Sequence, residues 1–171
     1  AYLDGLVAPI RSRVMPVASY VVTTEPLGDN RARALIRDDD AVSDANFVVD
    51  YFRLTADRRL LFGGRAAYSG RHPKDLARNM RPRILRIFPQ LSDVAMSHAW
   101  GGYIGITYNR LPDVGRIGDN LYYVQGFSGQ GVTLSGMLGK LMAEAIAGEA
   151  ERFELFTRVK HLPFPGGPLR R

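Results

Sequence analysis

The sequence predicts an α+β fold in which a mixed or antiparallel sheet carries its helices on one side. Stretches rich in β-branched and aromatic residues follow one another along the chain, without the regular strand–helix alternation of a parallel sheet. Helical spacing of apolar residues occurs in one segment in the middle of the chain and in one near its end. With 171 residues, of which 46% are hydrophobic, the chain is long enough to bury a core.

Five segments have the composition of strands. The first contains Val17, Tyr20 and Val22 and is broken by the turn-forming residues 26–30. The second and third are expected to form a hairpin, because the residues between them, 55–59, are compatible with a turn. The predicted strands cover residues 14–24, 46–54, 60–63, 94–107 and 121–125.

Two segments are predicted to be helices. In residues 73–88, apolar side chains recur every four positions from Leu76 to Phe88, which marks one face of a helix. Pro82 lies inside this segment and is expected to kink or divide the helix. The second helix is predicted over residues 132–147, with Gly148 as its stop.

A glycine-rich run joins the last predicted strand to the last helix. Gly126, Gly129 and Gly131 allow positive φ angles and a close approach of a ligand to the backbone. A strand, a glycine-rich turn and a helix N-terminus together favour negative charge, because unpaired N–H groups and the helix dipole converge there. The alternative interpretation is a glycine turn that only caps a core helix.

Two phosphate-loop motifs do not fit this run. In a Walker A loop that starts at Gly126, the lysine position is occupied by Val132. In a dinucleotide fingerprint that starts at Gly129, the third glycine position is occupied by Leu134.

Composition and charge exclude several classes of protein. The chain has no cysteine, which excludes disulfides, thiolate metal sites and a cysteinyl flavin linkage, and a cytoplasmic location fits this composition. It has no run of ~18 apolar residues and no signal-peptide pattern, so no membrane partner is expected. The net charge of +6 comes from dispersed arginines and from a basic C-terminal tail expected at 151–171, so no nucleic-acid partner is expected. No metal site is predicted.

Three motifs carry a resemblance to a known family. They are residues 126–132 (Gly-Phe-Ser-Gly-Gln-Gly-Val), residues 100–107 (Trp-Gly-Gly-Tyr-Ile-Gly-Ile-Thr) and residues 110–115 (Arg-Leu-Pro-Asp-Val-Gly). Their order and spacing resemble the C-terminal part of the FAD-dependent amine and amino-acid oxidoreductases, the group of D-amino acid oxidase, glycine oxidase and sarcosine oxidase. The variant at residues 109–112 is most similar to the gamma-glutamylputrescine oxidase branch. The resemblance extends from about residue 13 to about residue 148.

The resemblance also implies a domain organisation. Residues 26–94 would be part of a substrate-binding domain, and residues 1–25 and 95–150 the C-terminal part of the FAD-binding domain and its sheet. Members of the family open with a dinucleotide-binding domain that carries a Gly-x-Gly-x-x-Gly loop, and no such motif precedes Gly63 here. We therefore expect a C-terminal portion that lacks this partner domain, does not retain FAD alone and is inactive alone. The oligomeric state stays open, and an unpaired apolar edge would favour a homo-oligomer.

The chemistry implied by the resemblance is oxidation of a C–N bond by hydride transfer to the flavin. The resemblance places flavin contacts on the backbone of the glycine-rich run, and Ser128 or Thr133 would add a hydroxyl or act as a structural N-cap. In some relatives a basic residue follows this run, where Thr133 stands here, so oxidase and dehydrogenase behaviour both stay open. The predicted cofactor-binding residues are Gly126, Phe127, Ser128, Gly129, Gln130, Gly131, Val132 and Thr133.

The predicted substrate is a small amine, such as a polyamine derivative. In the glycine oxidase type, the arginine that binds the substrate carboxylate corresponds to Ile104 here, which argues against a simple α-amino acid. The candidate substrate-binding residues are Tyr51, Trp100, Tyr103 and Arg110, and each could equally be a core or turn residue. No catalytic base stands out. Two alternatives remain, a noncatalytic interaction module that keeps the fold and an anion- or nucleotide-binding domain.

Overall fold

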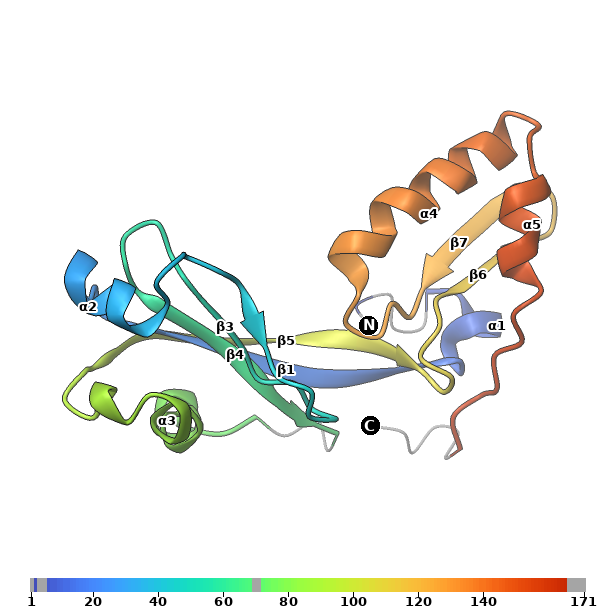
Figure 1. The fold of residues 1–171 in the computed structure, drawn as a ribbon. Coiled ribbons are helices and arrows are strands. Elements are labelled where there is room, and N and C mark those ends of the chain that lie inside the picture. The colour runs from blue at the N-terminus through green and yellow to red at the C-terminus, as the bar shows by residue number, and fades with distance from the viewer. Residues whose placement is uncertain (1, 3–5, 69–71, 166–171) are drawn as a thin grey trace. The chain divides into compact units, whose positions relative to one another are not determined.

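The computed structural model describes residues 2, 6–68 and 72–165 (Figure 1). The chain forms two compact units, one of Ala1–Val17 with Tyr103–Arg171 and the other of Ala18–Gly102. The boundary falls inside two long strands, β1 (Val14–Thr24) and β5 (Met96–Thr107). The second unit contains the segment 26–94 that the resemblance assigns to substrate binding.

The 18–102 unit contains a five-stranded sheet in the order β2-β3-β4-β1-β5. The pairs β2–β3, β3–β4 and β4–β1 are antiparallel. Glu25 contacts Ala95, and Tyr20 contacts Gly101. Residue numbers therefore fall along β1 as they rise along β5, so this pair is antiparallel too. The predicted α+β class is confirmed. The three shorter strands are β2 (Val42–Ser43), β3 (Tyr51–Leu54) and β4 (Leu60–Ala67).

One helix covers one face of this sheet. The helix α3 (Leu76–Ile87) begins at Asp75, whose side chain accepts a hydrogen bond from the Arg78 N–H at 2.9 Å. Met80 and Ile84 of α3 are buried. On the sheet, Phe52 stacks on Phe62, with ring centroids 5.7 Å apart. The Phe52 ring also meets the edge of Phe88, at the C-terminal end of α3, with centroids 5.0 Å apart.

Two shorter helical elements complete the 18–102 unit. The helix α2 (Asp29–Leu35) buries Ala32, and the 3₁₀ turn η1 (Pro89–Leu91) buries Leu91.

Two predictions for this unit need correction. Of the kink or division predicted at Pro82, the division does not occur: α3 is continuous through Pro82, and Pro82 and Arg78 lie on the exposed side of the helix. There water can satisfy the Arg78 carbonyl that has lost its N–H partner. The predicted strand 46–54 begins only at Tyr51, since the preceding residues form a closed loop between Asp44 and Asp50. The predicted hairpin of β3 and β4 is confirmed.

The other unit is built on a hairpin and helices. The strands β6 (Asp113–Ile117) and β7 (Leu121–Gln125) pair antiparallel, and β7 leads to the helix α4 (Gly131–Ile146). Gly148, with φ +102°, follows α4 as predicted. The unit also contains the short helix α1 (Ala8–Arg11). Its core consists of Val114, Leu138, Leu141, Ala145 and Phe153.

The predicted basic tail at 151–171 is wrong in its first third. Residues Glu151–Thr157 form the helix α5, and Phe153 is only 4% exposed in the core of the unit. The Tyr122 ring lies 5.6 Å from the Phe153 ring, so α5 is held against the hairpin by aromatic contact. Arg170 and Arg171, at the end of the predicted tail, lie outside the described residues.

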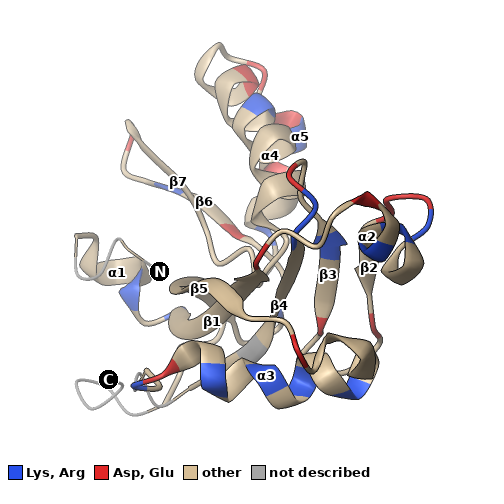
Figure 2. Ribbon diagram, turned by 90° about the vertical axis from the view of Figure 1, so that its left-hand side faces the viewer, with Lys and Arg blue, Asp and Glu red and all other residues tan. Residues whose placement is uncertain are grey.

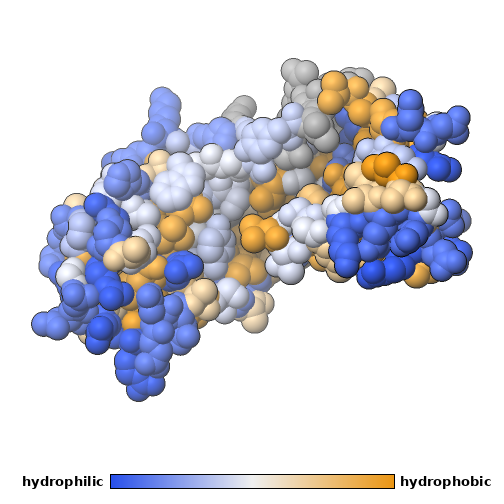
Figure 3. Space-filling view, turned by 90° about the horizontal axis from the view of Figure 1, so that it is seen from above, coloured by the Kyte–Doolittle hydropathy of each residue, from blue (hydrophilic) through white to orange (hydrophobic). Residues whose placement is uncertain are grey.

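Many arginines in the 18–102 unit lie beside acidic residues. Arg31 donates to Asp93, Arg58 to Asp29, and Arg59 to Asp57. Figure 2 shows basic and acidic segments close to one another around α2. Positive charge in this unit is therefore partly offset by local ion pairs, and hydrophilic residues gather at the end of the unit that carries α2 (Figure 3).

The described residues give two negative findings. None of their helices combines the length and the apolar character needed to cross a bilayer. Within the same ranges, no three His, Cys, Asp or Glu side chains gather as a metal site would require.

Candidate functional site

The glycine-rich run turns sharply out of β7. Gly126 has φ +67°, a conformation that glycine adopts without strain. A Cβ at this position would overlap Cγ2 of Thr107 and lie 3.2 Å from Cγ2 of Val14. Gly126 is therefore required by the packing of the fold itself.

Ser128 fastens the run to β5. Its N–H donates to the Gly105 carbonyl at 2.8 Å, and its Oγ accepts from the Thr107 N–H at 3.3 Å. The same hydroxyl donates to the Gly126 carbonyl at 3.2 Å. Phe127 adds a β-bridge to Ile106. The Ser128 hydroxyl thus holds the loop, and it does not cap α4, whose N-cap residue is Gln130 with no side-chain hydrogen bond.

The N-terminus of α4 presents backbone donors. Its first helical bond runs from the Leu134 N–H to the Gln130 carbonyl at 3.0 Å. The N–H groups of Gly131, Val132 and Thr133 therefore precede the hydrogen-bonded ladder of the helix. Val132 is 99% exposed, and nothing lies within 4 Å of the position that a Cβ on Gly129 would take. These donors can reach a negatively polarised ligand atom.

A buried carboxylate lies behind the run. Asp113 on β6 is 1% exposed; its Oδ1 accepts from Nη1 of Arg13 at 3.3 Å and its Oδ2 from Nε2 of Gln125 at 2.9 Å. Gln125 also donates to the Ile10 carbonyl at 3.0 Å, so the residue before Gly126 is fixed on two sides. The Tyr123 hydroxyl lies between Arg13 and Asp113. Burial, with the negative charge of Asp113, raises the pKa of Tyr123 above its ordinary value.

The sequence argument missed this network. Asp113 belongs to the motif at residues 110–115, but its partners Arg13 and Gln125 are 100 and 12 positions away along the chain. Only the hydrophobic residues around Asp113 could have indicated its burial.

The sheet of the 18–102 unit brings two predicted substrate residues to one face. Tyr51 pairs with Gly63, and Gly63 pairs with Val21. A Cβ on Gly101 would overlap the ring of Tyr20, so Gly101 and Tyr20 share one face, and by strand alternation Val21 and Trp100 share the other. Tyr51 is 37% and Trp100 47% exposed, while α3 covers the opposite face. Two aromatic side chains thus stand open on one side of the sheet.

Gly63 determines how Tyr51 lies. A Cβ on Gly63 would overlap the Tyr51 ring, so the ring rests on the bare backbone of β4. Because Gly63 has no side chain, the surface of the sheet between Tyr51 and Trp100 is flat at this position.

The other two candidates belong to the other unit. The Tyr103 N–H donates to the Tyr2 hydroxyl at 2.7 Å, and their rings meet edge to face with centroids 6.0 Å apart. Arg110, with φ +66°, lies in the exposed turn after β5, and its N–H donates to the Thr107 carbonyl. The Asn109 side chain supports the same turn through the Leu111 N–H. Through these contacts, Tyr103 and Arg110 each support the local structure of their unit.

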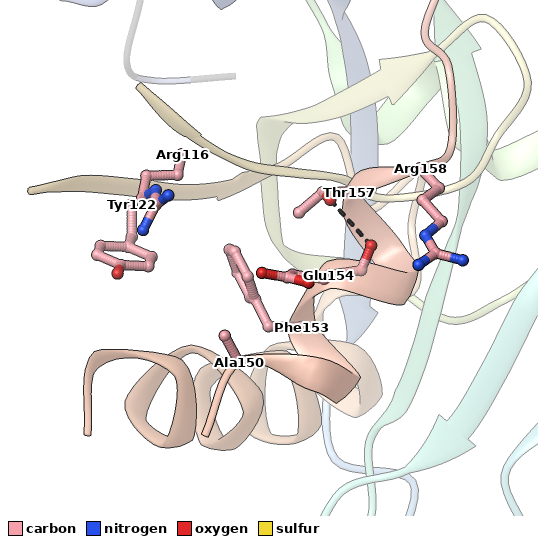
Figure 4. A pocket seen from close by; sticks show the side chains of 7 residues that line it. All are labelled: Arg116, Tyr122, Ala150, Phe153, Glu154, Thr157 and Arg158. Atoms are coloured by element: carbon pink, nitrogen blue, oxygen red, sulfur yellow. Dashed lines mark hydrogen bonds between the residues drawn. The ribbon is translucent and has the colours of Figure 1, made fainter. Parts of the chain in front are cut away.

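A pocket of about 350 Å³ lies between the hairpin and α5 (Figure 4). Phe153 and Tyr122 form its apolar part, and Arg116 and Glu154 bring charges of opposite sign into it. The Arg116 guanidinium lies 5.9 Å from the centre of the Tyr122 ring. Its mixed charge favours no ligand class, and it contains none of the predicted site residues.

Known proteins are similar to this chain over most of its length. The FAD dependent oxidoreductase family matches residues 1–145. Gamma-glutamylputrescine oxidoreductase of Escherichia coli (strain K12) is 46% identical over 168 residues, covering 98% of this chain and 39% of that protein. The probable oxidoreductase OrdL of Haemophilus influenzae is 39% identical over 171 residues, again 98% of this chain and 39% of that protein.

Solved structures show the same fold. Glycine oxidase from Geobacillus kaustophilus has a TM-score of 0.72 at 21% identity, over 92% of this chain and 42% of that one. L-proline dehydrogenase from P. horikoshii has a TM-score of 0.67 at 22% identity, over 85% of this chain and 39% of that one. The chain spans about two fifths of the length of these relatives. Because the family match covers most of the sequence, the chain belongs to the FAD dependent oxidoreductase family.

Proposed function

We propose that the full-length protein is an FAD-dependent oxidoreductase that oxidises a C–N bond of a gamma-glutamylputrescine-like amine. The observation that carries the proposal is the set of exposed N–H groups at Gly131, Val132 and Thr133. The loop before them is fixed by hydrogen bonds of Ser128 to β5 and of Gln125 to the Ile10 carbonyl. Support for the substrate class comes from the 46% identical relative named gamma-glutamylputrescine oxidoreductase. An N-terminal dinucleotide-binding part, which the resemblance to the family implies, belongs to the proposal.

The residues present fit one edge of a flavin. The three free N–H groups would donate to the cofactor, and the dipole of the 16-residue helix α4 would favour negative charge at that place. Ser128 would act indirectly, because its hydroxyl is already bonded to β5 and to Gly126. Bound FAD would supply the two-electron oxidation, with hydride as the transferred species.

The open sheet face would hold the amine. Tyr51 and Trp100 offer aromatic surface to an alkyl chain or an ammonium group. Ile104 stands where an arginine would bind a substrate carboxylate in the glycine oxidase type. This supports a substrate that is not held by a carboxylate at that position.

The first test is spectroscopic. The full-length protein is purified, its absorbance is recorded, and gamma-glutamylputrescine is added without oxygen. Flavin bands near ~450 nm that bleach on addition are the expected result. Flavin that does not bleach would overturn the substrate. A colourless protein that FAD cannot reconstitute would favour a noncatalytic module.

A charge substitution tests the carrying observation. Val132→Glu places a carboxylate at the exposed start of α4, where it stabilises the helix but repels negative charge on the cofactor. We expect the FAD dissociation constant to rise about tenfold, while the melting temperature stays level or rises. Val132→Gln is the matched control without charge. Equal FAD affinity in both variants would contradict the assignment of this helix end to the flavin.

A further inference from the structure

The Asp50 carboxylate is completely buried, but only its Oδ1 accepts hydrogen bonds from the described residues. It is 0% exposed. Nε and Nη2 of Arg83 both approach its Oδ1, at 2.8 and 2.6 Å. Its Oδ2 is buried without a hydrogen bond from any described residue, and Nη2 of Arg86 lies 3.6 Å from it. Because a buried carboxylate without full partnering is unfavourable, its place in the fold calls for an explanation.

The backbone of Asp50 closes the loop that precedes β3. The Asp44 N–H donates to the Asp50 carbonyl at 2.9 Å, and the Asp50 N–H donates to Oδ1 of Asp44 at 3.0 Å. Burial acts to raise the pKa of Asp44, but hydrogen bonds from Asn46 and Asp50 outweigh it and lower the pKa below the ordinary value. Asp44 therefore remains an ionised acceptor, and the loop is fixed at its base.

Asp50 and Tyr51 belong to opposite faces of the sheet. The Asp50 carboxylate meets Arg83 of α3, and Phe52 meets Phe88 at the end of α3, so these alternate residues point toward the helix. Tyr51, between them, lies over Gly63 on the open face. A Cβ on Gly64 would overlap Oδ1 of Asp50, so β4 leaves room for this carboxylate as well as for the Tyr51 ring.

We propose that Asp50 is a positioning residue for Tyr51: the carboxylate, gripped by Arg83, fixes the start of β3 and sets the Tyr51 ring on Gly63. This inference rests on the proposed function, in which Tyr51 contacts the amine. Asp50 itself touches no substrate, because it is buried on the helix side of the sheet.

The direct test reads Tyr51 without substrate. The full-length protein is labelled with 3-fluorotyrosine, and Tyr51→Phe assigns the Tyr51 resonance by removing it. Asp50→Asn is expected to shift or broaden that resonance, because a neutral amide loosens the grip of Arg83. Asp57→Asn, which breaks an exposed ion pair with Arg59 in the turn of the same hairpin, is the matched control and should leave it unchanged. An unchanged Tyr51 resonance in Asp50→Asn would overturn the proposal.

A kinetic cycle separates positioning from general stability. Asp50→Asn should raise KM for gamma-glutamylputrescine about fivefold with kcat little changed, since misplacement of a binding group weakens binding. In the Tyr51→Ala background the same substitution should have no further effect. Effects that multiply in the double variant would show that Asp50 acts independently of Tyr51, and the proposal would fall.

Two further outcomes are distinguishable. If the wild-type protein does not oxidise the amine, the proposed function falls, and the fluorine resonance still decides the role of Asp50. If Asp50→Asn does not fold, Arg83→Lys, which keeps the charge but not the two-nitrogen grip, takes its place in both experiments.

Discussion

Each unit of the protein holds its candidate site with one buried carboxylate, and the two carboxylates are bonded differently. Asp113 accepts hydrogen bonds on both oxygens, from Arg13 and from Gln125. Asp50 is gripped by Arg83 on one oxygen, while the other has no hydrogen bond among the described residues. The first arrangement fixes a backbone from two sides, and the second holds a strand from one side only.

The difference matches what each site offers. The glycine-rich run presents backbone N–H groups, which need a rigid main chain and no particular side chain. The sheet face presents the Tyr51 and Trp100 side chains, which can adjust their rotamers around a ligand. The carboxylate with hydrogen bonds on both oxygens, Asp113, therefore belongs to the site whose main chain must be rigid before the ligand binds.

The largest predicted effect compares the two carboxylates directly. Asp113→Ala removes the buried carboxylate that Arg13 and Gln125 share, and we expect a loss of about 3 kcal/mol in the free energy of unfolding. Asp50→Ala should cost less, about 2 kcal/mol, because one of its oxygens makes no hydrogen bond. Urea unfolding of the full-length protein measures both. The reverse order would break the comparison.

Two neighbouring glycines of β4 should respond unequally. In Gly64→Ala the new methyl meets Oδ1 of Asp50, which Arg83 holds, and lies 3.2 Å from the Val49 carbonyl oxygen, so about 2 kcal/mol of stability is lost. In Gly63→Ala it meets only the ring of Tyr51, a partly exposed side chain that can swing away. We expect less than about 1 kcal/mol there, together with a higher KM for the amine.

A pH dependence sharpens the comparison on the Asp113 side. Since the pKa of Tyr123 in the folded protein is raised above the ordinary tyrosine value of 10.0, its contribution to stability is complete below that pH and is lost as pH rises through the folded pKa. Tyr123→Phe should remove this loss, which we place below about 1 kcal/mol because the phenol is only partly buried. Urea unfolding at a series of alkaline pH values measures it. Tyr108→Phe, at an exposed tyrosine, is the control and should keep the wild-type slope.

The smallest effect on stability is expected at Gly131. Its Cβ would lie 3.7 Å from Phe127, an ordinary contact, and alanine favours the helix, so Gly131→Ala should gain up to about 0.5 kcal/mol. A lower FAD affinity in this variant would show that the glycine serves the ligand. Unchanged affinity together with higher stability would mean that the methyl group does not hinder the approach to α4.

The strand, turn and helix around the glycine-rich run could be predicted because their signals are local. Residues 121–125 and 131–146 became the expected strand and helix within one residue. Positive φ at Gly126 and Gly129 follows from the sequence, since glycine adopts it without strain. The occupied hydroxyl of Ser128 does not, because its partner Thr107 lies 21 positions away.

Non-local contacts explain the errors. Residues 47–49 have strand-forming side chains, but hydrogen bonds between Asp44 and Asp50 close this segment into a loop. In α5, charged residues at 151, 152 and 154 concealed the apolar pair Phe153 and Phe156, which packs against the hairpin core. That Tyr51 and Trp100 share a face depends on the register of four strands, which no single segment of the sequence encodes.

Pro82 has a consequence for the orientation of α3. A helix with a proline in its interior has one carbonyl, here that of Arg78, that no backbone N–H can reach, and this group must stay in water. Turning α3 about its axis would carry that carbonyl into the sheet. Because of Pro82, α3 can bury only the side that carries Met80 and Ile84. The observed orientation of α3 also brings Arg83 to Asp50, so Pro82, which makes no contact with the candidate site, helps to decide which side chains reach it.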